Sequence, residues 1–218
     1  KIVNDYEDAA YHRARLISFA PSGKNERDLW SIKATLSIDL KQGNTRQVDY
    51  TAKVNLKRRA SLTRFLLDYI GNLSKINGND GSLVETVNNH RLGLSFDHYK
   101  TRYFFYTPIF AEFYRDPFLN IDMKSTIGAG LGYTVIDTAS TELSFAGGPA
   151  YMKTDFISVA PGEDDSESTP AAVIRTNYDF EVSSTMDFIA RYNIQVGNTA
   201  SGGYTHHVIL TLENEITG

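Results

Sequence analysis

The 218-residue sequence contains no cysteine, and this absence excludes disulfide scaffolds, thiolate metal sites and cysteine nucleophiles. It also has no apolar run approaching the roughly 20 residues of a membrane-spanning helix, which excludes a helical membrane protein. The net charge of -4 offers no basic field, so we expect no nucleic-acid partner. Tryptophan occurs once, but 13 tyrosines and 12 phenylalanines make the chain rich in other aromatic residues.

Ten segments of the sequence alternate apolar side chains with polar or small ones, the period-two pattern of a β-strand with two different faces. The sixth segment places Ile127 and Leu131 on one face and Gly128, Gly130 and Gly132 on the other. At roughly 15 residues it exceeds the five or six residues usual in soluble sheets. The predicted strands span residues 30–41, 48–57, 61–73, 91–99, 103–114, 119–135, 141–153, 172–182, 186–196 and 208–213.

The connections between these segments alternate in length. Those after even-numbered segments are tight, whereas those after odd-numbered segments tend to be longer, at 76–82, 115–118, 154–170 and 197–203, with a short exception at 42–45. Outer-membrane barrels alternate short periplasmic turns with longer external loops in this way. The pattern predicts an all-β, antiparallel up-and-down transmembrane β-barrel with a periplasmic N-terminus.

We expect two parts in the chain. Residues 1–28 form an N-terminal periplasmic or lumen-inserted segment, with helix formers in 6–19, and residues 29–218 form the barrel. The last residues lack the terminal aromatic strand usual in such barrels, so we expect a missing C-terminal hairpin and twelve strands in the complete molecule. A soluble β-sandwich or lipocalin-like barrel is the structural alternative, because its strands also alternate.

Three stretches of the sequence resemble one known family. The first is 30–45, ending in Gly43, Asn44 and Thr45; the second is 114–118 followed by Gly128, Gly130, Gly132 and Tyr133; the third is 142–151 with Gly147, Gly148, Pro149, Ala150 and Tyr151. Together they resemble the salt-induced outer-membrane proteins, domain-of-unknown-function family 481, over residues 29–212. The resemblance implies a β-barrel in the outer membrane of a Gram-negative bacterium, in contact with outer-membrane lipids and lipopolysaccharide. It brings no catalytic residue, and a salt-induced role is suggested only by the family's label.

Catalysis by a surface lipase or deacylase is the enzymatic alternative, and the sequence argues against it. A His-x-Ser pair on a strand would place both side chains on one face. The residues two places after the five histidines are Ala14, Leu92, Lys100, Val208 and Ile209, so no such pair exists. We therefore expect a protein that is not an enzyme and has no catalytic residues.

Two clusters invite a metal interpretation. His206 and His207 are adjacent, so on a regular strand they point to opposite faces and cannot share one ion; a histidine at the membrane interface explains them better. The acidic run 163–168 is compatible with calcium binding, but a solvated loop is the simpler interpretation. We expect no metal and no cofactor.

The polar faces of the predicted strands carry charges of both signs. The candidates for lining the lumen or pore are Lys33, Asp39, Asp49, Lys53, Lys57, Asp68, Arg91, Asp97, Glu112, Asp122, Lys124, Glu142, Arg175, Asp179, Glu181, Asp187 and Arg191. Such a ladder either selects small solutes in a narrow channel or neutralises itself in a plugged interior. The three glycines of the sixth strand leave space on this face for bulky neighbours such as Phe110 or Tyr106.

From these observations we expect a non-enzymatic envelope protein, either structural or a narrow pore for small polar solutes or ions. An outer-membrane lipid-modifying enzyme and a soluble ligand-binding barrel are the alternatives. The sequence names no protein partner, solute or oligomeric state.

Overall fold

The computed structural model describes residues 25–42, 46–78, 82–138, 140–183, 185–197 and 203–214. These residues form ten long strands and two short 3-10 helices. The strands are β1 (Trp30–Lys41), β2 (Gln47–Arg59), β3 (Thr63–Asn77), β4 (Leu83–Tyr99), β5 (Phe104–Asp116), β6 (Ile121–Asp137), β7 (Thr141–Phe156), β8 (Ser166–Ser183), β9 (Met186–Val196) and β10 (Tyr204–Asn214). The 3-10 helices are η2 (Glu26–Leu29) and η3 (Pro117–Leu119).

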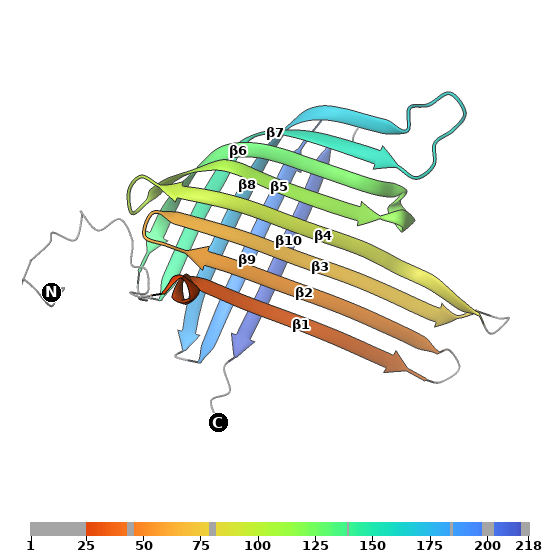
Figure 1. Ribbon diagram of the computed structural model, residues 1–218, viewed down its shortest axis with the longest axis horizontal. Coiled ribbons are helices and arrows are strands. Elements are labelled where there is room, and N and C mark those ends of the chain that lie inside the picture. The colour runs from red at the N-terminus through yellow and green to blue at the C-terminus, as the bar shows by residue number, and fades with distance from the viewer. Residues whose placement is uncertain are drawn as a thin grey trace, which may run out of the picture.

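All ten strands belong to one sheet in which each strand pairs antiparallel with the next along the chain (Figure 1). The up-and-down antiparallel prediction is therefore confirmed, and so are the bounds of β1 and β9. The loop predicted over 154–170 is wrong in extent, because β7 continues to Phe156 and β8 begins at Ser166. Part of the acidic run accordingly lies in a strand, where Glu167 opposes Thr154.

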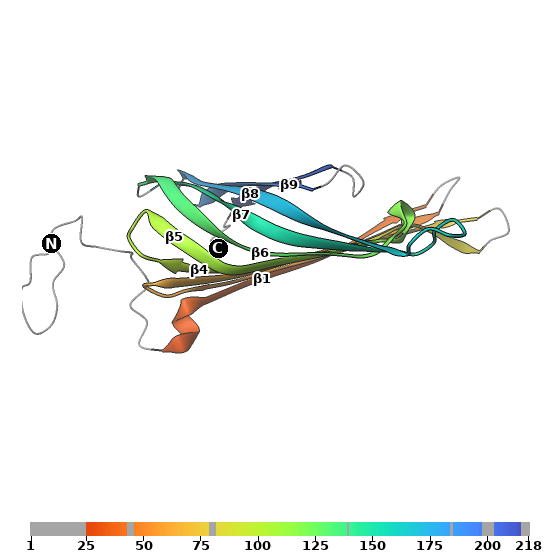
Figure 2. The same cartoon turned by 90° about the horizontal axis from the view of Figure 1, so that it is seen from above.

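The sheet curls so that β8, β9 and β10 face β3, β4 and β5 across an interior (Figures 1 and 2). A hydrogen bond between Arg191 on β9 and Asp68 on β3 crosses this interior, as does one between Gln195 on β9 and Glu112 on β5. Among the described residues β1 and β10 are the two sheet edges and are not paired with each other. The sheet is thus a curled half-barrel.

The two faces of the sheet differ in chemistry. Large apolar side chains are exposed on the convex face, including Ile32, Leu36, Ile38, Leu40, Ile127, Leu131, Val135, Ile174, Val208, Leu210 and Leu212. The concave face is mostly polar, because the buried side chains of the described residues comprise twelve polar or charged and six apolar ones. This distribution is the reverse of that in a soluble β-protein, where the apolar face turns inward.

Glycines make room for two aromatic rings inside the curl. A side chain at Gly132 would overlap the ring of Phe105, and a Cβ at Gly128 would come within 2.5 Å of the Phe110 Cζ atom. The expectation that this strip accommodates Phe110 is confirmed. Tyr106, the other expected neighbour, instead lies against His98, with ring centroids 4.9 Å apart.

An irregularity in β5 explains why its sequence is aromatic on both faces. The register with β6 shifts between Thr107 and Phe110, next to Pro108, which has no backbone N–H to donate to a ladder. Phe105 and Thr107 are buried before this shift, and Phe110 is buried after it. The inward side chains therefore change from odd to even positions within one strand.

The described residues do not include the helix expected over 6–19, so the plug role of that segment stays a prediction. They also do not include residues 215–218. The first described element, η2, is held to the sheet because Arg58 donates from Nε to Glu26 Oε1 at 2.6 Å. Over the part of the chain that the structure describes, no helix has the length and apolar character needed to cross a membrane.

Candidate functional site: the charged interior cavity

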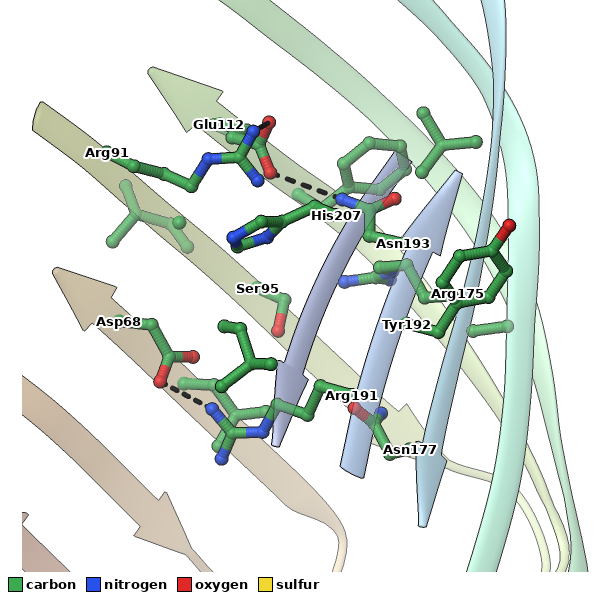
Figure 3. Close-up of a pocket in the computed structure, with 18 of the residues that line it drawn as sticks. Asp68, Arg91, Ser95, Glu112, Arg175, Asn177, Arg191, Tyr192, Asn193 and His207 are labelled. Atoms are coloured by element: carbon green, nitrogen blue, oxygen red, sulfur yellow. Dashed lines mark hydrogen bonds and ion pairs between the residues drawn. The ribbon is translucent and has the colours of Figure 1, made fainter. Parts of the chain in front are cut away.

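A cavity of about 130 Å³ lies inside the curl, between the wall formed by β3, β4 and β5 and the wall formed by β8, β9 and β10 (Figure 3). Charged and amide side chains from both walls line it, together with the apolar side chains of Phe105, Phe110, Ala146 and Val173. The volume is below the roughly 300–1,000 Å³ of sites for drug-sized ligands, so the cavity suits a small molecule or ion.

One wall of the cavity presents a row of three polar side chains. Arg175 on β8 lies opposite Asn193 on β9, and Asn193 lies opposite His207 on β10. Directly opposed residues on antiparallel strands share a face, so the three side chains project into the same space. Figure 3 shows the row above Arg191, which lies two residues before Asn193 on the same strand.

The facing wall contributes Arg91 on β4 and Glu112 on β5. Arg91 Nη2 lies 3.5 Å from Glu112 Oε1, and both side chains are largely buried. Glu112 also accepts hydrogen bonds across the interior, from Asn193 Nδ2 at 3.2 Å and from Gln195 Nε2 at 2.7 Å. This carboxylate therefore connects the two walls at one point.

A buried network closes the end of the cavity near the tight turns. Arg64 on β3 donates to Asp97 on β4 at 2.9 Å and 2.8 Å, through Nε and Nη2. Thr107 donates to the other oxygen of Asp97 at 2.6 Å and accepts from Arg175 Nη2 at 3.3 Å. Four residues from four strands thus meet at this end, and Nε and Nη2 of Arg64 both contact the same oxygen of Asp97.

A second cavity, of about 430 Å³, continues toward the loop end of the sheet. It is lined by Tyr114, Lys124 and Thr205, and Lys124 Nζ donates to Thr205 Oγ1 at 3.0 Å across the interior. Both cavities share a boundary of side chains from both walls, namely Ile70, Arg91, Glu112, Gln195 and His207. The contacts of Glu112 therefore lie at the constriction between the two cavities.

The predicted lumen residues divide into those that line these cavities and those that do not. The lining includes Asp68, Arg91, Asp97, Glu112, Lys124, Arg175 and Arg191. It excludes Lys33, Asp39, Asp49, Lys53, Lys57, Asp122, Glu142, Asp179, Glu181 and Asp187. Lys33, Asp39, Asp49, Lys53 and Lys57 lie on β1 and β2 near the open edge, and Glu142 meets Arg64 at 3.5 Å by the turn end.

Asp122 is a candidate that lines neither cavity. Its side chain is 57% exposed near the loop end and lies 3.5 Å from Arg115 Nε. Asp179 and Asp187 lie toward the opposite, turn end of β8 and β9. A charged side chain on the polar face does not necessarily line a cavity, because its position along the strand decides which side chains lie beside it.

Sequence reasoning missed several polar lining residues, among them Arg64, Asn193, Gln195 and His207. Asn193 and Gln195 carry no charge, and His207, which the sequence did not assign to the lumen, lines the interior. The available signal was the alternation of faces along a strand. Asn193 and Gln195 follow Arg191 by two and four positions, and Arg64 precedes Asp68 by four, so each shares a face with a predicted lumen residue.

The histidines of the convex face contact tyrosines. His206 Nδ1 lies 2.8 Å from the Tyr192 hydroxyl, and His90 Nδ1 lies 2.8 Å from the Tyr69 hydroxyl. His206 is exposed whereas His207 faces the interior, as expected for neighbours on a strand. Among the described residues no three acidic, histidine or cysteine side chains are grouped for metal binding.

Comparison with known proteins gives one match. The model of the family described as protein of unknown function, DUF481, matches residues 34–218. Neither the curated proteins nor the solved structures contain a match.

Proposed function

The chain belongs to the DUF481 family, and we propose that it is a non-enzymatic β-barrel protein of a bacterial outer membrane that forms a narrow pore for small polar solutes or ions. The observation that carries this proposal is the inverted distribution of side chains over the curled sheet. Apolar side chains on the convex face suit contact with lipid, and the polar concave face suits a lumen.

Aromatic residues near the tight-turn end support the membrane location. Trp30 and Phe65 are in edge contact with centroids 6.4 Å apart, and the Tyr103 and Tyr133 rings stack at 6.1 Å. Three of these four rings are exposed on the convex face. Rings of aromatic residues at the height of the lipid headgroups are typical of transmembrane barrels.

The contacts across the interior argue for a narrow path rather than a wide channel. Glu112 joins Arg91, Asn193 and Gln195 where the two cavities meet. A solute that passes from the larger cavity to the smaller one must displace or exchange these contacts. Selection by a few charged groups at a constriction is the ordinary mechanism of a selective pore.

The backbone of the two sheet edges sets a condition on this proposal. In lipid, unpaired N–H and C=O groups cost several kcal/mol each, so β1 and β10 require partners in the membrane. Pairing of the two edges with each other, or with further strands, meets that condition.

Reconstitution of the purified full chain into a planar lipid bilayer tests the proposal. We expect small current steps from the unmodified protein and larger steps from Glu112→Ala, because the substitution removes three contacts at the constriction. Asp122→Ala is the matched control, since it removes an exposed carboxylate outside the cavities and leaves the current unchanged.

Membrane insertion is measured separately. We expect the protein to remain with liposomes after an alkaline carbonate wash and to require detergent for a monodisperse solution. The proposal is contradicted if the protein stays monodisperse without detergent and if neither the unmodified protein nor the Glu112→Ala variant passes current.

A further inference from the structure

The smaller cavity contains more cationic than anionic side chains. Its lining has four arginines, Arg64, Arg91, Arg175 and Arg191, against three carboxylates, Asp68, Asp97 and Glu112. Each carboxylate already lies within ion-pair distance of one arginine: Asp97 of Arg64, Glu112 of Arg91 and Asp68 of Arg191. Within the described residues, the remaining arginine, Arg175, has no carboxylate at that distance.

Among the described residues no carboxylate directly contacts the Arg175 guanidinium group, and Asp97 and Glu112 attract it only from beyond ion-pair distance. Its direct contacts are the hydroxyl of Thr107, at 3.3 Å, and the ring of Phe110, whose centroid lies 4.7 Å from Cζ. Neither group carries a negative charge. A guanidinium withdrawn from water in this way is stabilised by an anion that accepts two parallel hydrogen bonds.

Two further atoms of the cavity lack a hydrogen-bond partner among the described residues. Asn193 Oδ1 and Arg91 Nη1 are both buried and unpaired. Asn193 is the cross-strand neighbour of Arg175, and its Nδ2 is committed to Glu112, which fixes its Oδ1 as the free acceptor. The site therefore offers two cationic donor groups and one acceptor around one small space.

We propose that this cavity binds a small carboxylate that carries a hydroxyl group on the neighbouring carbon. The carboxylate pairs with Arg175, with Arg91 Nη1 as a second donor, and the hydroxyl donates to Asn193 Oδ1. The apolar side chains of Phe110 and Val173 contact the carbon skeleton. The inference rests on the proposed function, since it names the solute class of the same interior.

Two properties favour this ligand over others. The planar fork of a guanidinium matches a carboxylate and not a spherical ion such as chloride. The volume of about 130 Å³ admits a molecule of a few heavy atoms and excludes an acyl chain or an oligosaccharide.

Binding of radiolabelled lactate to the detergent-solubilised full chain, measured by equilibrium dialysis, tests the inference. We expect saturable binding at one site per chain. Arg175→Gln should weaken binding by about tenfold or more, because a charge-assisted pair is lost. Arg115→Gln is the matched control, because it removes one exposed positive charge near the loop end and should leave lactate binding unchanged.

Two more measurements make the test specific. Arg175→Lys keeps the charge and should retain anion binding while losing preference for lactate over chloride, which separates loss of the site from loss of folding. Asn193→Ala should reduce the affinity for lactate more than the affinity for acetate, because only lactate has the hydroxyl that donates to Asn193 Oδ1. Circular dichroism checks that each variant keeps its strand content.

The outcomes separate this inference from the proposed function. Lactate binding in detergent without any current in a bilayer overturns the pore and leaves the site. A current with no saturable lactate binding, or with chloride competing as well as unlabelled lactate, overturns the carboxylate site and leaves the pore.

Discussion

At the scale of single residues, Glu26 makes a pH-dependent contact that the fluorescence of Trp30 can report. The carboxylate accepts hydrogen bonds from Arg58 Nη2 at 3.1 Å and from Trp30 Nε1 at 3.2 Å, and Trp30 is the sole tryptophan. The hydrogen bond from Arg58 is the main cause that lowers the pKa of Glu26. A lowered pKa means that the contact stabilises the fold above the usual glutamate range and is lost as pH falls through the lowered value.

We therefore expect Trp30 fluorescence to change with a midpoint below the ordinary pKa of a glutamate. Titration of the protein in detergent from pH 6 to about pH 3 measures it, that range covering the usual glutamate value. Glu26→Gln should remove the transition. A midpoint at or above the ordinary value would contradict the assigned contact.

Gly132 tests the packing of the concave face at the same scale. Gly132→Ala places a methyl group where the Phe105 ring lies, and we expect a loss of about 1–3 kcal/mol in the free energy of unfolding from overpacking. Gly93→Ala is the control, since its Cβ would meet the nearest atom at 3.9 Å, and its cost should be small. Urea unfolding of both variants in detergent measures the difference, and equal losses would contradict the packing of Phe105 on Gly132.

At the scale of elements, the connection between β5 and β6 depends on one carboxylate. Asp116 is 8% exposed and accepts from the Phe118 backbone N–H at 3.0 Å and from the Tyr114 hydroxyl at 2.8 Å. Asp116→Ala leaves both donors without this acceptor, so we expect a loss of about 1–2 kcal/mol in unfolding free energy. Asp122→Ala, an exposed carboxylate in the next strand, should change it by less than about 0.5 kcal/mol under the same urea unfolding.

The elements themselves could be predicted from the sequence, because strand alternation and turn residues are local signals. Periodicity located all ten strands and their antiparallel order. It missed the change of face at Pro108, because one bulge residue shifts the parity of everything after it. Periodicity also could not separate lining residues such as Arg175 from residues outside the lining such as Asp122, because curvature and register decide which strands face each other.

At the scale of the whole molecule, the curl brings together residues that are 123 positions apart. Arg191 Nη1 on β9 donates to Asp68 Oδ1 on β3 at 2.6 Å, and five strands separate them in the order of the sheet. A flat sheet of ten strands could not make this contact. The contact between Arg191 and Asp68 therefore depends on the curvature of the whole sheet, and neither strand alone determines that curvature.

A double-mutant cycle on this pair tests the curled architecture. We expect Asp68→Ala and Arg191→Ala to be coupled by about 0.5–3 kcal/mol in the free energy of unfolding, as for groups in direct contact. The control cycle pairs Arg191→Ala with Asp122→Ala, which share no contact and should be additive within about 0.5 kcal/mol. Additivity in both cycles would mean that β3 and β9 do not face each other, and would remove the curled interior on which the cavities depend.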